Sequence, residues 1–192
     1  MTPAVPSSRR SPFDKLRASG SFMSARAEPV EARAATSSSI RRARPSDAAA
    51  CAAIMRASIR ALPAGDLPTR TRAAWASLPA LYHRWAMGPG GEVYLVAARA
   101  GRLVGYAALR ADELTAAFVR PRAQGAGIGR ALVAAAAALA GRSGVRRLRV
   151  LAARPAVGFY AALGFRGTAA ARVPLPGGVA LEAVRMRLAL EP

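Results

Sequence analysis

Three alternating glycines are the residues of this chain that point most directly to chemistry. Gly125, Gly127 and Gly129 follow a proline-terminated apolar run, and they lead into a strongly helical segment that begins at Ile128. Glycines have no Cβ, so their backbone N–H groups can converge on an anion, and the N-terminus of the following helix adds about half a positive charge. The segment is therefore predicted to hold an anionic group such as a phosphate.

Two familiar nucleotide-binding patterns need residues that this turn lacks. A P-loop continues from its last glycine with Lys and then Ser or Thr, whereas Gly129 is followed by Arg-Ala. A dinucleotide-binding turn needs G-x-G-x-x-G, but its last position here holds Arg130 or Leu132, depending on the glycine from which it is counted. An acidic residue about twenty positions further on is also missing. Both patterns are excluded.

A third pattern, Q/R-x-x-G-x-G/A, is met by residues 124–129, which read QGAGIG. A second motif, FYAALGF, occupies residues 159–165, and the strand ending Phe118-Val119-x-Pro121 precedes the glycines. With these motifs the chain resembles the GNAT-type N-acetyltransferases over about residues 39–192. The resemblance implies a mixed α/β fold with one central sheet, the GNAT-like acyltransferase fold. It also implies an enzyme that transfers an acetyl group from acetyl-CoA, its co-substrate, to a primary amine of a small molecule, a peptide or a protein.

The resemblance implies how acetyl-CoA is held. Backbone groups of Phe118 and Val119 would pair with the pantetheine arm like an added strand, and the turn would bind the pyrophosphate. Arg130 would add a charge-assisted contact, unless it is a solvated arginine on the helix face. The phosphate-binding residues expected on this basis are Gln124, Gly125, Ala126, Gly127, Ile128, Gly129 and Arg130.

Two residues are expected to carry protons on the same basis. In this family the tyrosine of the second motif faces the CoA sulfur, so Tyr160 is the expected proton donor to the departing thiolate. Histone-type members use a glutamate at the position of Glu113 to take the amine proton through water. Asp112 is a weaker candidate for this base. The alternative is that the amine proton leaves through a chain of waters without one fixed base.

Other reactive side chains have simpler interpretations. Cys51 falls on the apolar face of a helix, so it is expected in the core, and direct attack in a ternary complex is preferred to an acyl-cysteine route. His83 is expected to be structural. The resemblance places a second helical region beside the acceptor. Its aromatic residues are expected either to form a wall of the acceptor site or simply to pack in the core: Trp75, Tyr82 and Trp85. The turn 174–178 would approach from the other side.

The elements that must position these residues follow from periodicity and from turn residues. The expected order is β-α-α-β-β-β-α-β-α-β-β, with a hairpin turn at 99–102. The expected strands are 40–44, 93–98, 103–109, 113–119, 145–151, 167–174 and 179–190, and the helices are 47–62, a region within 63–92, 128–140 and 156–163.

Composition limits the other function classes. The 192 residues carry a net charge of +19 with one Cys and one His, so neither a disulfide framework nor a zinc centre is expected. No apolar run is long enough to span a membrane, and a soluble, cytoplasmic bacterial protein is predicted. The basic residues are almost all arginines, spread along the chain as G+C-rich codon usage would spread them.

Two alternative functions and one segment complete the sequence-based expectations. A non-catalytic acyl-CoA-binding or sensor module is the first alternative, and a basic nucleic-acid-binding protein is the weaker one. Residues 1–38 are rich in Ser, Pro, Arg and Ala, and they are predicted to be a disordered extension. This extension resembles a translated intergenic DNA repeat, and the alternative is that the translation start is placed too early. No metal and no membrane partner are expected, and the resemblance leaves a homodimer open.

Overall fold

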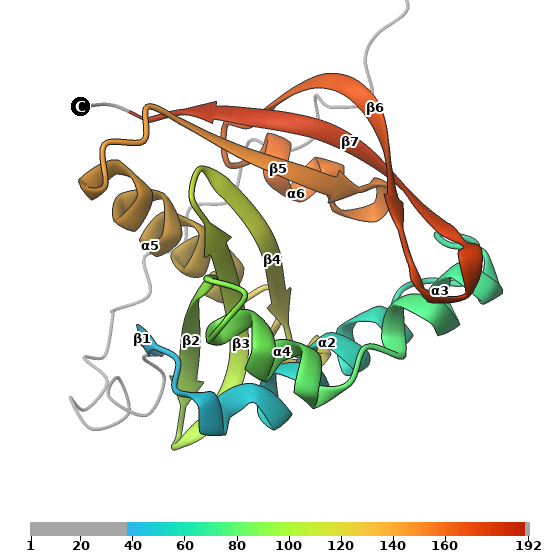
Figure 1. The fold of residues 1–192 in the computed structure, drawn as a ribbon, viewed down its shortest axis with the longest axis horizontal. Helices are drawn as coiled ribbons and strands as arrows, with labels where there is room; N and C mark the ends of the chain where they lie inside the picture. The colour runs from blue at the N-terminus through green and yellow to red at the C-terminus, as the bar shows by residue number, and fades with distance from the viewer. Residues whose placement is uncertain (1–37, 191–192) are drawn as a thin grey trace, which may run out of the picture.

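The computed structural model describes residues 38–190, so the predicted extension 1–38 lies outside the described residues apart from Ser38. The elements follow the predicted order, with short 3-10 helices added and with the second helical region divided in two by Pro79 (Figure 1). Their bounds are β1 Ser39–Arg42, η1 Pro45–Asp47, α2 Ala48–Arg60, α3 Thr69–Ala76, α4 Ala80–Met87, β2 Val93–Arg99, β3 Arg102–Arg110, β4 Glu113–Val119, η2 Pro121–Ala123, α5 Ile128–Arg142, β5 Arg147–Ala153, η3 Arg154–Ala156, α6 Val157–Ala161, β6 Arg166–Pro174, η4 Pro176–Gly178 and β7 Ala180–Ala189.

The strands form one sheet in the order β1-β2-β3-β4-β5-β7-β6. Neighbouring strands are antiparallel except for β4 and β5, which are parallel. A parallel pair needs a crossover connection, and α5 supplies it. The predicted mixed α/β fold with one central sheet is confirmed.

Helices cover both faces of this sheet (Figure 1). The strand alternation decides which side chain meets which helix: on β2, Val96 packs in the cluster under α2, while Ala97 packs in the cluster under α5. From the helices, Ile54 of α2 and Leu132 of α5 are fully buried against the two faces. Each such buried side chain stabilises the fold by about 1.5–3 kcal/mol.

The predicted hairpin at 99–102 is confirmed. Ala100 and Gly101 have φ values of +48° and +72°, the left-handed conformation that a type I′ turn requires at both central positions. This turn, together with a one-residue register shift between Ala97 and Ala98, sets the pairing of β2 with β3, in which Val96 lies opposite Tyr106. It thereby aligns the aromatic residues of the two strands on one face.

The middle of β4 is irregular, and this irregularity opens the sheet. The partners of Ala108 and Leu109 on β4 are two residues apart, so Thr115 between them is the extra residue of a β-bulge. β4 pairs with β5 at Glu113 and Leu114 and at no later residue of these two described strands. Beyond that point β4 and β5 diverge (Figure 1).

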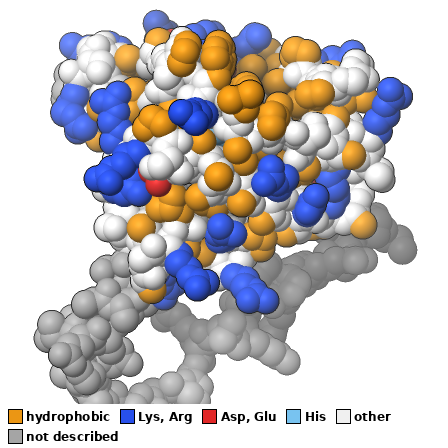
Figure 2. All heavy atoms as spheres, turned by 60° about the horizontal axis from the view of Figure 1, so that its bottom comes forward, with side chains coloured by type: hydrophobic (Ala, Val, Ile, Leu, Met, Phe, Trp, Pro, Cys, Tyr) orange, Lys and Arg blue, Asp and Glu red, His pale blue; other side chains and the backbone are white. Residues whose placement is uncertain are grey.

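Arginine side chains are scattered over the surface. Figure 2 shows them distributed among apolar side chains on one face, without a continuous basic stripe. This arrangement gives the nucleic-acid alternative no defined binding track on that face. Within residues 38–190, no helix combines the length and apolar character needed to cross a bilayer.

Candidate active site

The divergence of β4 and β5 leaves a cleft of about 550 Å³. Its walls come from β4, the glycine turn, the start of α5, the segment after β5, and helices α2 and α3. We call it the β4–β5 cleft. It is lined by Ser58, Ile59, Leu62, Trp75, Thr115, Ala116, Ala117, Phe118, Val119, Ala123, Gln124, Gly125, Gly127, Ile128, Gly129, Arg130, Leu132, Ala153, Pro155, Ala156 and Phe159.

The glycine turn forms one end of this cleft. Gly125 and Gly127 have φ values of +79° and +76°, which only glycine adopts without strain, and Gly127 is the N-cap of α5. No side chain caps the helix and no acidic residue lies in its first turn. The first amides of α5 therefore remain available to an anion, and the helix dipole favours negative charge there.

The backbone of β4 supplies the long wall. The Arg120 amide donates to the Val104 carbonyl on β3, and hydrogen bonding alternates along an antiparallel pair, so Phe118 also faces β3. Val119 faces the cleft, where its carbonyl accepts hydrogen bonds from Ser58 Oγ at 2.8 Å and from Gln124 Nε2 at 3.2 Å.

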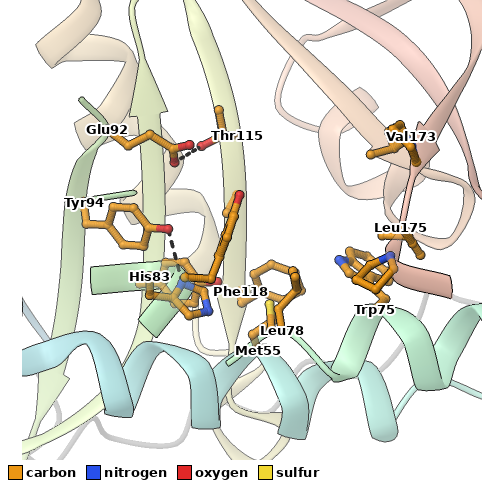
Figure 3. A pocket seen from close by; sticks show the side chains of 15 residues that line it. Met55, Trp75, Leu78, His83, Glu92, Tyr94, Thr115, Phe118, Val173 and Leu175 are labelled. Atoms are coloured by element: carbon orange, nitrogen blue, oxygen red, sulfur yellow. Dashed lines mark hydrogen bonds between the residues drawn. The ribbon is translucent and has the colours of Figure 1, made fainter. Parts of the chain in front are cut away.

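A second, smaller cavity of about 240 Å³ lies beside the cleft. It is enclosed by α2, α3, α4, the strands β2 to β4 and the end of β6, and Figure 3 shows its side chains. We call it the aromatic cavity. It is lined by Met55, Trp75, Leu78, Tyr82, His83, Glu92, Tyr94, Tyr106, Thr115, Ala116, Phe118, Val173, Pro174, Leu175 and Pro176.

Aromatic rings form a continuous row through this cavity. Trp75 meets Phe118 edge-on at 5.7 Å between ring centroids, and Phe118 lies 5.6 Å from Tyr106. Tyr106 stacks on Tyr94 at 5.4 Å with an interplanar angle of 9°, and His83 lies edge-on to Tyr94. Such contacts each contribute about 0.5–1.5 kcal/mol beyond burial, so the row is a rigid wall.

Two polar contacts interrupt the apolar lining (Figure 3). Thr115 Oγ1 donates to Glu92 Oε2 at 2.7 Å, and His83 Nδ1 lies 3.2 Å from the Tyr94 hydroxyl. Burial, with a smaller effect of the positive Arg56, lowers the pKa of His83 to about 4. His83 is therefore neutral near pH 7, and its Nε2, like the Tyr106 hydroxyl, is buried without a hydrogen-bond partner.

The two cavities share a wall. Thr115, Ala116 and Phe118 of β4 and Trp75 of α3 line both of them. A group bound in the β4–β5 cleft beside these residues therefore lies next to a group bound in the aromatic cavity. The β-bulge at Thr115 is what directs this part of β4 toward both spaces.

The cofactor-binding residues expected from the sequence lie together. Phe118, Val119, Gln124, Gly125, Gly127, Ile128, Gly129 and Arg130 all line the β4–β5 cleft, and Ala126 does not. The register nevertheless turns the backbone of Phe118 toward β3, so Phe118 offers its side chain to the cleft. The role of each residue toward acetyl-CoA stays a prediction.

The two expected catalytic residues are not brought together. Tyr160 lies on α6, is 5% exposed and packs edge-on against Phe165 at 5.4 Å, while its neighbour Phe159 lines the cleft. Burial raises the pKa of Tyr160, which keeps its hydroxyl protonated. Glu113 lies at the start of β4, opposite Arg149 of β5, and lines neither cavity.

Other expectations have clear outcomes. Cys51 is fully buried in the core under α2, as predicted, and burial raises its pKa to about 12. Trp75 and Tyr82 line the aromatic cavity, whereas Trp85 is 53% exposed and does not. The turn after β6 contributes Pro174 and its two successors, as expected. Within residues 38–190, no group of three His, Cys, Asp or Glu side chains is arranged to hold a metal ion.

Sequence reasoning missed Glu92 and Thr115. Glu92 is buried, with 7% of its surface exposed. It is the one carboxylate among the residues that line the aromatic cavity. Its signal in the sequence was weak: a single acid between the glycines after α4 and the first residue of β2. Thr115 had no signal, because a bulge depends on the register of β4 against β3.

Comparisons with known proteins agree with this geometry. A family model described as an acetyltransferase (GNAT) domain matches residues 73–188. No protein of curated function matches the chain. A GCN5-related N-acetyltransferase structure from Rhodopseudomonas palustris is 33% identical, with a TM-score of 0.73, over 79% of this chain and 95% of that one.

Two more distant structures share the fold. The PaiA N-acetyltransferase from Thermoplasma acidophilum, solved with coenzyme A, has 18% identity and a TM-score of 0.63 over 80% of this chain and 99% of that one. A phosphinothricin acetyltransferase from Sinorhizobium meliloti, solved with acetyl-CoA, has 23% identity and a TM-score of 0.57 over 80% and 88%. The family model spans more than half of the chain and the first structure nearly all of the described part, so the chain belongs to the GNAT family of N-acetyltransferases.

Proposed function

We propose that this enzyme transfers the acetyl group of acetyl-CoA directly to a primary amine while both are bound. The observation that carries this proposal is that the two spaces adjoin: Thr115, Phe118 and Trp75 line both a cleft suited to a long anionic ligand and a smaller cavity. The thioester would lie at the inner end of the β4–β5 cleft and the amine in the aromatic cavity. Positioning the two reactants in this way supplies much of the catalysis.

The cleft fits acetyl-CoA in its parts. The free amides at the start of α5 and the adjacent Arg130 would hold the pyrophosphate. The backbone of Ala117 and Val119, which faces away from β3, would pair with the pantetheine arm. The structures solved with coenzyme A and acetyl-CoA have the same fold, which supports this placement.

In direct transfer the acceptor nitrogen loses two protons and the departing sulfur gains one. An ammonium acceptor first loses one proton and its nitrogen attacks the thioester carbon. The nitrogen then loses its second proton as the C–S bond breaks to give an amide and a thiolate. The thiolate then takes a proton, for which Tyr160 is the proposed donor. Tyr160 is buried and lines neither cavity, so its proton would reach the thiolate through a water, and the second amine proton replaces it. Glu113 stays a prediction as the base; since it lines neither cavity, it would act only through waters.

An acyl-cysteine route has no support in the geometry. Cys51 is the one cysteine of the chain, it lines neither cavity, and burial raises its pKa to about 12. Its thiol is therefore protonated and inaccessible to a thioester in the cleft.

Three measurements test the proposal together. Acetyl-CoA is expected to raise the melting temperature, a panel of primary amines to yield free thiol, and initial rates against both substrates to give intersecting lines. Parallel lines would indicate a covalent intermediate and contradict direct transfer. Stabilisation by acetyl-CoA without turnover of any amine would instead identify a non-catalytic acyl-CoA-binding module.

A further inference from the structure

We infer that the acceptor is a small primary monoamine with an apolar, ring-sized body and no acidic group, and that Glu92 receives its ammonium. This inference rests on the proposed function and names the substrate class of the aromatic cavity. It draws on the charge left inside that cavity, on its position relative to the cleft, and on what the lining excludes.

Glu92 is a buried carboxyl group without a basic partner among the described residues. Its side chain is 7% exposed and is held by a hydrogen bond from Thr115. The ion pairs within residues 38–190 join arginines to Asp47, Asp112 and Glu182, and none includes Glu92. A carboxylate buried without a cation is costly, and the ammonium of an acceptor offsets that cost.

The position of Glu92 suits an amine that is about to react. Thr115 lines both cavities, so the Glu92 carboxylate lies one hydrogen bond of 2.7 Å from the shared wall. The ammonium would give one proton to Glu92, directly or through one water, and so become the neutral nucleophile. In this inference Glu92 takes the first proton in place of Glu113, and that proton leaves to solvent after the reaction. The second amine proton replaces the one that Tyr160 gives to the thiolate.

The rest of the lining defines the body of the acceptor. Opposite Glu92 the walls are apolar, with Leu78, Phe118 and Leu175 among them (Figure 3). The volume of about 240 Å³ leaves room for one ring with a short chain. None of the residues that line the aromatic cavity is Lys or Arg, although the chain carries 29 of them.

This lack of a basic lining residue excludes an acidic acceptor. A carboxylate or phosphate on the acceptor would enter a mostly apolar space that no Lys or Arg lines and that Glu92 does line, so it would be buried at a cost of several kcal/mol. A polyamine would satisfy Glu92 with one ammonium and bury its other charges without partners. An amino acid and a polyamine are therefore both expected to be poor substrates.

Three amines separate these cases. With acetyl-CoA and the full chain, 2-phenylethylamine is expected to give a kcat/KM at least about 100-fold above that of L-phenylalanine, which adds a carboxylate, and of spermidine, which adds charges and lacks the ring. A kcat/KM for L-phenylalanine or spermidine equal to or above that of 2-phenylethylamine overturns the inference. So does stabilisation by acetyl-CoA without turnover of 2-phenylethylamine.

Two variants test Glu92 itself. Glu92→Gln is expected to lower kcat/KM for 2-phenylethylamine by about 100-fold, while the stabilisation by acetyl-CoA is unchanged. Glu182→Gln, at an exposed ion pair with Arg172, is the matched control and should alter neither. Unchanged kcat/KM in Glu92→Gln overturns the role of Glu92. Failure of acetyl-CoA to bind the wild-type chain would instead refute the proposed function.

Discussion

Acidification from pH 7 to pH 4.5 is expected to destabilise this protein through His83. The ring is 1% exposed, its Nδ1 lies 3.2 Å from the Tyr94 hydroxyl, and its Nε2 has no hydrogen-bond partner. A charged imidazolium there would carry a second N–H donor with nothing to accept it. Burial first, and the positive Arg56 second, lower the pKa of His83 to about 4.

The sign and the size follow from proton linkage. Between pH 6.5 and pH 4 the unfolded chain binds a proton at His83 that the folded chain does not, so stability falls as the pH falls. One pKa unit corresponds to about 1.4 kcal/mol, and the interval from pH 7 to pH 4.5 removes about 2 kcal/mol. Asp47 and Asp112 have lowered pKa values because of ion pairs with arginines, so they lose their contributions below this interval.

The single histidine makes the measurement simple. Imidazole resonances of the folded chain belong to His83 alone, and their NMR titration should give a pKa near 4. Urea unfolding at pH 7 and pH 4.5 should show the loss of about 2 kcal/mol, and His83→Phe should lack that loss. An imidazole pKa near 6.5, or the same loss in His83→Phe, would refute the reasoning.

Three further outcomes concern the proton donor and two glycines. Tyr160→Phe is expected to lower kcat about 100-fold and to leave stabilisation by acetyl-CoA unchanged, and an unchanged kcat would exclude the hydroxyl as donor. Gly90→Ala places a Cβ 2.7 Å from the Ala86 Cα, so thermal unfolding should show a loss of about 2 kcal/mol. Gly141→Ala, within α5 and with no atom near the new Cβ, is the matched control and should stabilise by about 0.5–1 kcal/mol.

The sequence predicted the parts of the site that depend on local chemistry. The glycine turn was identifiable because the residues that shape it are adjacent in the chain, and Gly125 and Gly127 do take the left-handed conformation. The strand 113–119 was placed with its observed bounds, since Ala111 and Pro121 delimit it. The core position of Cys51 followed from helical periodicity alone.

The parts that sequence reasoning missed depend on contacts between distant segments. Glu92 is buried because α4 and the turn at residues 88–91 fold back onto β2 and β4, and no neighbour in the sequence indicates this. Thr115 reaches it because of a bulge that exists only in the pairing of β4 with β3. Glu113 lies nearer than Glu92 to the glycine motif in the sequence. It nevertheless belongs to the end of β4 that is still paired with β5, so it lies away from both cavities.

The excess of arginine gives the protein a positive electrostatic field, and the sign of this field affects which acceptor binds. With a net charge of +19, the protein attracts anionic acetyl-CoA and repels cations, and the repulsion grows in proportion to the charge of the cation. A monoamine meets that repulsion once and offsets it at Glu92, whereas each further ammonium of a polyamine is repelled with no second carboxylate in the aromatic cavity. The surface charge and the single buried carboxylate therefore select the same acceptor, a monoamine.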